Sequence, residues 1–266
     1  MTDNLLEIQN LSMSYIIEND VIFAKKYLNP VLNNVCLNIK QGQVLGLVGG
    51  SGCGKSTLGK CILALSPQNS VIEGKILFEG KDISKFNKKE MKNYRKNAQL
   101  IFQNPYSSLN PRMSVFETLS EPLSTHKICD KSEYKNKIED MLDLVGLKKE
   151  DKSKFPHEFS GGQRQRIAIA RALITSPKFI VADEPVSALD VSIQAQIINL
   201  LCSLKKELNL TILFISHDLN IVRYLSDSIA IMERGEIIEE GSAQEIFEKP
   251  KADYTKNLLN AILKLN

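Results

Sequence analysis

The sequence predicts an α/β fold in which a mostly parallel sheet carries functional residues at the carboxyl ends of its strands. Three short apolar runs, residues 44–48, 179–182 and 211–215, have the character of buried strands, and each leads directly into a glycine-rich or polar segment. Parallel strands in α/β folds place ligands at their carboxyl ends, so we expect these three strands to bring their polar residues to one edge of one sheet.

Strand-like alternation at both ends of the chain predicts additional antiparallel sheet. Residues 6–15 and 31–40 alternate near the start, and residues 228–232 and 236–240 flank a turn at Arg234-Gly235 near the end. We therefore expect an antiparallel β subdomain beside the parallel core.

The middle of the chain has helical rather than strand-like spacing. The segments with this character are residues 115–123, 131–145 and 161–174. They predict an α-helical subdomain, at about residues 104–174, inserted into a core that spans residues 6–248. Residues 254–265 again have apolar positions at helical spacing, so we expect a C-terminal helical extension over residues 249–266 that docks on the core.

Composition narrows the class of protein. The formal net charge is +3, and the lysine pairs are separated and interleaved with acids, which argues against a nucleic-acid-binding stripe. The five cysteines are scattered, without the Cys-x-x-Cys spacing of zinc or redox sites, as expected in a reducing cytoplasm. We see no secretory signal, and the longest apolar runs fall far below the ~20 residues needed to span a bilayer. The chain is expected to be soluble by itself.

Residues 49–57 match the phosphate-loop pattern G-x-x-x-x-G-K-[ST], and they stand between a predicted strand and a predicted helix, where the mechanism requires them. Glycines let backbone N–H groups curl around phosphate oxygens, and the start of the helix directs its free amides at the same anion. Lys55 is expected to bind the β- and γ-phosphates, and Ser56 to be a ligand of Mg²⁺. The residues of the loop are Gly49, Gly50, Ser51, Gly52, Cys53, Gly54, Lys55, Ser56 and Thr57.

Polar residues at the other two strand ends complete a hydrolytic site. Asp183 is expected to hold Mg²⁺ through its water shell, and Glu184 to polarise a water in line with the γ-phosphate. His217 follows the strand at 211–215, where a neutral imidazole could hydrogen-bond the γ-phosphate or that water. Together these features predict a P-loop nucleotide hydrolase with a RecA-like core and with ATP and Mg²⁺ as cofactors.

The segment at residues 159–166, which reads Phe-Ser-Gly-Gly-Gln-Arg-Gln-Arg, resembles the signature motif of ATP-binding cassette (ABC) ATPases, and the resemblance extends over nearly the whole chain. Ser160, Gly161, Gly162 and Gln163 stand at the start of a predicted helix, where small residues and free amides suit a second anion. In the family that anion is the γ-phosphate of the nucleotide held by the partner subunit.

Three further positions match the family. Gln103 resembles the Q-loop glutamine, which contacts Mg²⁺ and water and senses the membrane subunits. Asp190 resembles the D-loop aspartate, which crosses the dimer interface. Tyr15 is the candidate for the aromatic residue that stacks on adenine, with Tyr27 in the same segment as the alternative.

Several stretches point to one branch of the family. Residues 103–112, 155–166 and 182–192 resemble the oligopeptide, dipeptide and nickel importers of bacteria, and residues 16–30 with the Tyr-Thr-Lys at 254–256 resemble the second ATPase of such systems. The chain departs from the family at Gly50, where an acid is usual, and at residues 252–255, where relatives often read His-Pro-Tyr-Thr. We also expect no cysteine-containing tail of the kind that many relatives carry. Since the backbone binds at position 50, we expect little effect there.

The resemblance implies a subunit that hydrolyses ATP to drive an importer. The cargo is expected to be di- or oligopeptides first, and nickel or a metal chelate second. Expected partners are two integral membrane permease subunits, a second ATPase subunit in a heterodimer and, indirectly, an extracytoplasmic solute-binding protein. The expected location is the cytoplasmic face of the bacterial inner membrane.

Two alternatives stay open at this point. One is a soluble ABC ATPase that acts on nucleic acid or ribosomes, and the other is a module that only binds nucleotide. The expected catalytic residues are Lys55, Gln103, Glu184 and His217, and the expected metal ligands are Ser56, Gln103 and Asp183.

Overall fold

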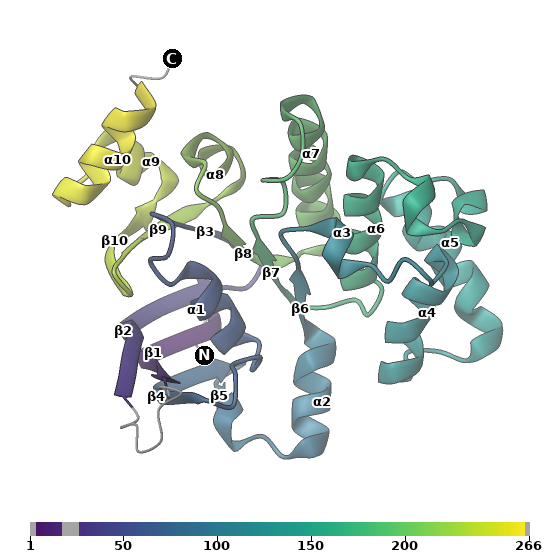
Figure 1. Ribbon diagram of the computed structural model, residues 1–266, viewed down its shortest axis with the longest axis horizontal. Coiled ribbons are helices and arrows are strands. Elements are labelled where there is room, and N and C mark those ends of the chain that lie inside the picture. The colour runs from purple at the N-terminus through teal and green to yellow at the C-terminus, as the bar shows by residue number, and fades with distance from the viewer. Residues whose placement is uncertain (1–3, 18–26, 264–266) are drawn as a thin grey trace. The chain divides into compact units, whose positions relative to one another are not determined.

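The computed structural model describes residues 4–17 and 27–263, and these form two compact units. Unit 1 comprises the described residues up to Phe86 together with those from Leu213 onward, and unit 2 comprises Asn87–Ile212. Figure 1 follows the chain through both. The expected bounds, 6–248 for the ATPase domain, about 104–174 for the helical insertion and 249–266 for the extension, stay a prediction.

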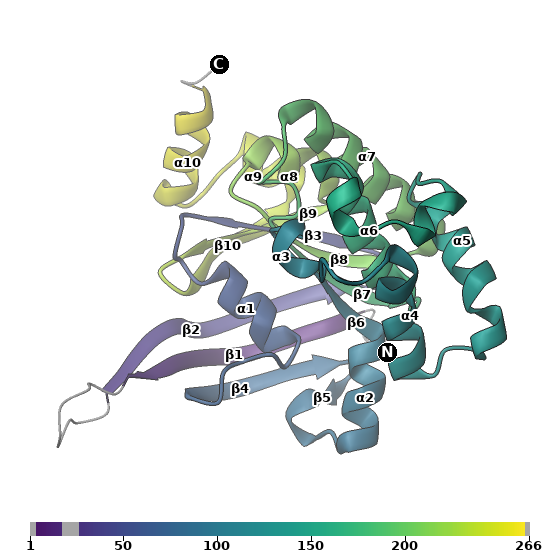
Figure 2. The ribbon, with the colours of Figure 1, turned by 45° about the vertical axis from the view of Figure 1, so that its right-hand side comes forward.

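Unit 1 contains the expected antiparallel sheet, with the strand order β2-β1-β4-β5. Its strands are β1 (Asn4–Ile17), β2 (Tyr27–Lys40), β4 (Ser70–Phe78) and β5 (Lys81–Asp82). β1 pairs antiparallel with β2 and with β4, which confirms the strands expected at 6–15 and 31–40. Figure 2 shows α1 (Lys55–Ile62) lying across this sheet.

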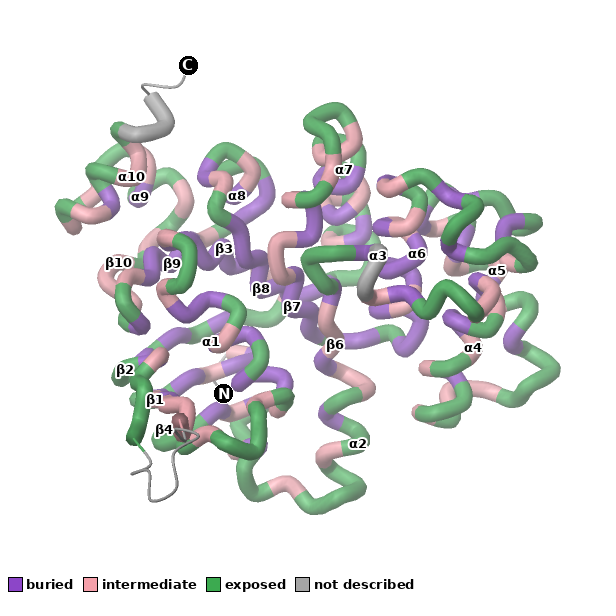
Figure 3. Tube along the Cα trace, in the orientation of Figure 1, coloured by how far each residue is buried: buried purple, intermediate pink, exposed green. Residues whose placement is uncertain are grey.

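Unit 1 also contains the central strand of the predicted core. β3 (Val44–Gly49) is buried along its whole length and runs parallel to β9 (Ser228–Glu233). β9 pairs antiparallel with β10 (Glu236–Ser242) on its other side, so the predicted antiparallel pair extends the parallel strands instead of joining the β1 sheet. Figure 3 shows the buried traces of β3 and β9. Three helices complete the unit: α8 (Leu219–Leu225), α9 (Ala243–Glu248) and α10 (Asp253–Leu263).

Unit 2 combines two parallel strands with a run of helices. β6 (Ala98–Ile101) pairs in parallel with β7 (Phe179–Asp183). Between them the described residues form helices and no strand: α3 (Pro105–Ser108), α4 (Val115–His126), α5 (Tyr134–Leu144) and α6 (Gly161–Leu173). α2 (Lys88–Asn97) precedes β6, and α7 (Val191–Leu208) follows β7. Short 3₁₀ helices occupy Ile83–Lys85 in unit 1 and Lys131–Glu133, Lys149–Ser153 and Pro156–Glu158 in unit 2.

The last predicted core strand, β8 (Thr211–Ile215), contains the boundary between the units and is fully buried. Its end is tied to β3, because the N–H of Ser216 donates to the carbonyl of Leu47 at 3.3 Å. The strands and helices thus confirm the predicted α/β class. The elements that sequence analysis did not assign are β4, β5, β6, α2, α3, α7, α8 and α9.

One glycine shapes the antiparallel sheet. Gly74 on β4 has a φ of +93°, and a Cβ there would lie 2.3 Å from the carbonyl oxygen of Asn10. It faces a register shift between β1 and β4 that falls between Gln9 and Ser12. A side chain at position 74 would therefore meet both backbone strain and a steric clash.

Gly74→Ala is expected to lower the free energy of unfolding by about 2 kcal/mol, through strain at a positive φ together with that clash. Urea denaturation measures the change. Glu73→Ala, at the neighbouring exposed position of the same strand, is the matched control and should stay within about 0.5 kcal/mol of wild type. Equal effects of the two substitutions would contradict the strain and the steric clash described at position 74.

Candidate functional site

The phosphate loop joins β3 to α1 as the sequence predicts. Gly54 is the N-cap of α1 and has a φ of +111°, a conformation that glycine adopts without strain. At the other end of the loop, a Cβ on Gly49 would lie 2.1 Å from the carbonyl oxygen of Met232 on β9. The two ends of the loop therefore need glycine for different reasons, one conformational and one steric.

Lys55 curls back over this loop. Its side chain is buried, and its Nζ donates to the carbonyl oxygens of Gly49 and Gly50, each at 2.8 Å. Within the loop, the N–H of Cys53 donates to the carbonyl of Gly50 at 3.4 Å. Ser51, Gly52 and Ser56 are exposed, and Thr57 is half-buried. A buried ammonium beside a glycine-rich turn at a helix start is the donor set that phosphate oxygens need, so these residues fit a nucleotide phosphate.

Gln103 and Glu184 meet in unit 2. β6 and β7 run side by side in parallel, with Ile101 opposite Ala182, so the residues that follow both strands emerge at the same end. The Nε2 of Gln103 donates to Oε2 of Glu184 at 2.9 Å and to Oγ of Ser187 at 3.4 Å. Ser187 in turn donates to the backbone carbonyl of Glu184 at 3.1 Å. The amide of Gln103 thus orients the carboxylate of Glu184.

Glu184 also has an unusual backbone. Its φ is +46°, in the left-handed region that residues with a Cβ rarely occupy. Asp183, the last residue of β7, and Glu184 are both half-buried. Backbone strain of this kind persists where the surrounding structure enforces it, and such positions cluster at active sites. The conformation was not predicted from sequence, since an acid after a strand carries no signal for a positive φ.

His217 lies in unit 1, directly after β8, and is exposed. The segment around it is held by two side chains. The Oγ of Ser216 accepts from the N–H of Asp218 at 3.0 Å, and the carboxylate of Asp218 caps α8 by accepting from the N–H of Asn220 at 2.8 Å. The imidazole therefore stands at a defined strand-to-helix turn.

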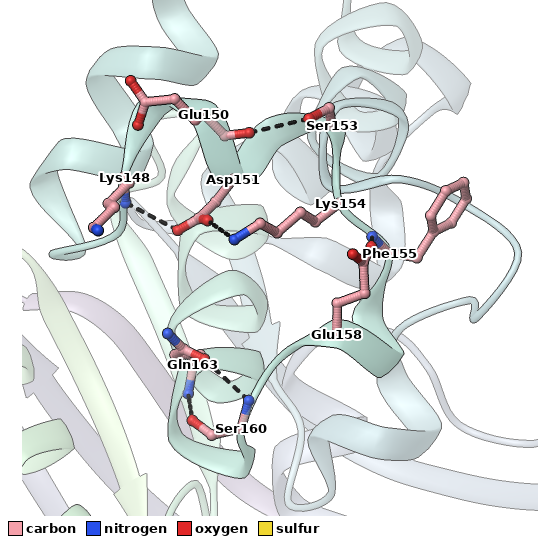
Figure 4. Close-up of polar contacts among 9 residues, drawn as sticks. All are labelled: Lys148, Glu150, Asp151, Ser153, Lys154, Phe155, Glu158, Ser160 and Gln163. Carbon is pink, nitrogen blue, oxygen red and sulfur yellow. Dashed lines mark hydrogen bonds and ion pairs between the residues drawn. The ribbon is translucent and has the colours of Figure 1, made fainter.

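The Ser160–Gln163 motif caps the start of α6. The N–H of Ser160 donates to Oε1 of Gln163 at 3.0 Å, and the N–H of Gln163 donates to Oγ of Ser160 at 3.3 Å. Figure 4 shows this reciprocal pair and, just upstream, two single bonds, from the N–H of Lys148 to Oδ2 of Asp151 and from the N–H of Phe155 to Oε2 of Glu158. The bonds between Ser160 and Gln163 order the start of α6, and the start of a helix is where backbone amides suit an anion.

Three arginines anchor α6 by donating to backbone carbonyls. Nε of Arg164 donates to Pro156 at 2.6 Å, Nη1 of Arg166 to Val145 at 2.6 Å and Nη1 of Arg171 to Ser108 at 2.7 Å. These carbonyls belong to the segments that precede the helix in the chain. The arginines therefore bind the end of α3, the residue after α5 and the 3₁₀ helix Pro156–Glu158 to one helix.

Gly162 has a packing role that sequence analysis missed. A Cβ at this position would lie 2.5 Å from Cγ2 of Ile193 on α7. The glycine thus lets α6 and α7 approach closely, in addition to any role in binding an anion. Only the tertiary structure reveals this contact, because the two residues lie far apart in sequence.

The remaining candidates are placed as follows. Asp190 is exposed and is the N-cap of α7, without a side-chain capping bond. Tyr15 is half-buried on β1 opposite Asn29 of β2, and the alternative Tyr27 is exposed at the start of β2. Residues 18–26, within the segment that suggested the second ATPase type, lie outside the described residues.

The structure brings two groups of candidates together. In unit 1 the loop that follows β3 leads into α1 at Lys55, whose Nζ binds back onto the loop, and His217 follows the neighbouring β8. In unit 2 Gln103 contacts Glu184, which adjoins Asp183. No group of three or more His, Cys, Asp or Glu side chains suited to a metal occurs among residues 4–17 and 27–263.

Comparison with known proteins places this chain in a family. The family model described as ABC transporter matches residues 32–187. The chain is 49% identical to the oligopeptide transport ATP-binding protein OppF of Streptococcus mutans, over 98% of this chain and 83% of that protein. It is 48% identical to the dipeptide transport ATP-binding protein DppF of Lactococcus lactis, over 97% of this chain and 81% of that protein.

Solved structures of ABC proteins are also similar to this chain. CbiO1 from Clostridium perfringens, part of an ABC transporter complex, matches with a TM-score of 0.77 and 29% identity over 99% of this chain and 98% of that one. A dimeric, post-hydrolysis structure of the ATP-binding cassette MJ0796 with ADP and Pi matches with a TM-score of 0.76 and 28% identity, over 90% of this chain and 98% of that one. The chain belongs to the ABC transporter family, and membership implies that it binds nucleotide.

Gly162→Ala is expected to destabilise the chain by about 1–3 kcal/mol, because the new methyl group would overlap Ile193. Without that overlap the substitution would stabilise α6, since alanine has a higher helix propensity than glycine. The sign of the change in urea denaturation therefore tests the contact. Ile193→Ala makes room for the methyl group, so the double variant should be less destabilised than the sum of the single variants.

Proposed function

We propose that this chain is the ATP-hydrolysing subunit of an ABC importer for dipeptides or oligopeptides. The observation that carries the proposal is the near-full-length similarity to proteins named for oligopeptide and dipeptide transport, in a chain that retains the phosphate loop, Glu184 and the signature motif. Nickel or a metal chelate is the second candidate cargo, from the resemblance of residues 103–112 and 182–192 to that group of importers.

The phosphate loop supplies the binding energy for the nucleotide in this proposal. Lys55 exchanges its bonds to the carbonyls of Gly49 and Gly50 for bonds to phosphate oxygens, and the amides at the start of α1 donate to the same group. Ser56, Asp183 and Gln103 are the residues that would hold Mg²⁺. When bound, Mg²⁺ supplies positive charge that offsets the negative charge of the phosphates.

Glu184 is the proposed general base. Its carboxylate takes up a proton from the attacking water, and the amide of Gln103, which donates to Oε2 at 2.9 Å, orients it for that task. His217 would hydrogen-bond the γ-phosphate or the attacking water from the end of β8. Tyr15, or Tyr27, would stack on adenine. These groups act mainly by position and charge, as phosphoryl transfer requires.

Each active site would be completed by a second ATPase subunit. Ser160, Gly161 and Gly162 present the capped start of α6 to the nucleotide of the partner, with Gln163 holding the cap and Asp190 at the interface. The importers that this chain resembles pair two different ATPases, so a heterodimer is proposed. Closure of the dimer over ATP would drive the membrane subunits between their access states.

The proposed partners are two integral membrane permeases and, indirectly, an extracytoplasmic solute-binding protein. No helix in the described part of the chain is both long and apolar enough to cross a bilayer. The subunit would bind the permeases from the cytoplasmic face of the bacterial inner membrane. A soluble ABC ATPase acting on nucleic acid or ribosomes is the rival, and the transport names of the relatives do not favour it.

Lys55→Ala should remove measurable ATP binding, because it deletes the buried ammonium of the phosphate loop.

Glu184→Gln should retain ATP binding, and its rate of hydrolysis should fall by about 10²-fold or more, as expected when a general base is removed. Binding is measured by calorimetry and hydrolysis by release of phosphate. Retained hydrolysis in Glu184→Gln would assign the base to another residue, and a wild-type rate no higher than that of Glu184→Gln would indicate a module that only binds nucleotide.

The Glu184→Gln protein is expected to stay as a closed dimer in ATP and Mg²⁺. A tagged form should therefore recover its partners from detergent-solubilised membranes. The expected result is two multi-span membrane proteins and one related ATPase, identified by mass spectrometry. Lys55→Ala protein is the matched control and should lose the partner ATPase. Recovery of ribosomes or nucleic acid instead would favour the rival function.

A further inference from the structure

The C-terminal helix reaches the phosphate loop through one tyrosine. Tyr254 is the second residue of α10, and its hydroxyl oxygen accepts a hydrogen bond from the N–H of Gly50 at 2.9 Å. The two residues lie 204 positions apart in the sequence and both belong to unit 1. α10 thus contacts the loop that is proposed to bind the nucleotide phosphates.

Tyr254 and Lys55 bind the same peptide group from opposite sides. The peptide between Gly49 and Gly50 has its carbonyl bonded to Nζ of Lys55 at 2.8 Å and its N–H bonded to Tyr254. Lys55 has to leave the carbonyl if it is to bind phosphate. Tyr254 binds the opposite side of the peptide, so its bond does not compete with phosphate for the ammonium and can persist when nucleotide is bound.

Tyr254 is itself fixed by the strand beside it. Glu239 on β10 accepts from the N–H groups of Lys251 at 2.7 Å and Ala252 at 3.0 Å, just before α10 begins. Thr255, the next residue after the tyrosine, is buried. Figures 1 and 2 show α10 on the same side of unit 1 as α9 and β10. The start of α10 is therefore anchored at two backbone amides, which sets the position of the ring.

The charge of Glu239 strengthens this anchor. Partial burial alone would raise its pKa, but the N–H groups of Lys251 and Ala252 and the charge of Lys251 help to hold its pKa below the ordinary value. The group is thus ionised at neutral pH, and hydrogen bonds to an ionised acceptor are stronger than those to a neutral one.

The fit between Gly50 and Tyr254 is close. A Cβ on Gly50 would lie 3.2 Å from the Tyr254 hydroxyl oxygen, closer than ordinary van der Waals contact allows. The sequence alone suggested that only the backbone matters at position 50. The structure adds that the size of the side chain at this position also matters, because of the contact with Tyr254. A side chain at position 50 would require the tyrosine hydroxyl to shift by a few tenths of an ångström.

We propose that Tyr254 is a positioning residue for the phosphate loop, and that its hydroxyl holds the Gly49–Gly50 peptide in the orientation in which the loop binds ATP. The C-terminal helix is thereby coupled to nucleotide binding. This inference rests on the proposed role of the loop in binding phosphate. The function assigned to Tyr254 is to orient the loop, which differs from the phosphate binding proposed for the residues of the loop itself.

Tyr254→Phe removes the hydroxyl and keeps the ring, so it tests the bond without disturbing the docking of α10. Loss of one neutral hydrogen bond should raise the Kd for ATP with Mg²⁺ by about two- to tenfold. The rate of hydrolysis at saturating ATP should be retained, because the residue touches no reacting atom. Calorimetry and steady-state kinetics on the full chain measure the two quantities. The free energy of unfolding without nucleotide should fall by about 1 kcal/mol at most, the loss of one hydrogen bond.

Tyr224→Phe is the matched control, since it removes a hydroxyl from an exposed tyrosine of α8 in the same unit. Its Kd should equal that of wild type. An unchanged Kd in Tyr254→Phe would overturn the proposal. So would tighter binding, because the contact would then oppose nucleotide instead of preparing the loop for it.

A double-mutant cycle tests the contact itself. Gly50→Ala should weaken ATP binding in the wild-type background, because the methyl group presses on the tyrosine hydroxyl. The same substitution should cost less in the Tyr254→Phe background, where the oxygen is absent. If Gly50→Ala raises the Kd for ATP by the same factor in both backgrounds, the coupling between the two residues is contradicted.

Lys55→Ala tests the proposed phosphate site separately from the proposed role of Tyr254. ATP binding retained in Lys55→Ala would refute the phosphate site, whatever the result for Tyr254.

Discussion

The close approach of bare backbone at the end of β3 is the constraint on which the proposed nucleotide site depends. β3 lies beside β9 with Gly49 opposite Met232, so close that no side chain fits between them. The chain can therefore turn sharply at the end of a fully buried strand. That turn brings the carbonyls of Gly49 and Gly50 within reach of the ammonium of Lys55. The orientation of a few peptide groups thus depends on packing between two strands.

Much of this arrangement could be predicted because its determinants are local. The strand at 211–215, the phosphate loop and the capped start of α6 are each specified by adjacent residues. The spacing of apolar and glycine residues reports such elements directly. The meeting of Gln103 with Glu184 was not predicted, because β6 was not assigned from the sequence; it follows from the parallel register of β6 and β7.

Other features could not be predicted, because they arise from contacts between distant segments. Nothing in the sequence around Gly162 indicates that Ile193 lies against it, and nothing around Gly50 indicates Tyr254. Several elements, including α2 and α7, also lacked an assignment. The choice between Tyr15 and Tyr27 stays open for a related reason. Both lie on the paired strands β1 and β2, so the strand assignment alone does not separate them.

The left-handed backbone at Glu184 has a consequence for the evolution of this chain. Glycine would adopt that conformation without strain, so replacing the acid with glycine would relieve a local destabilisation that the native residue maintains. A population selected for heat resistance alone would be expected to drift toward such replacements and to lose turnover. The carboxylate at this position would then reflect selection for the proposed role of Glu184 as general base against selection for stability.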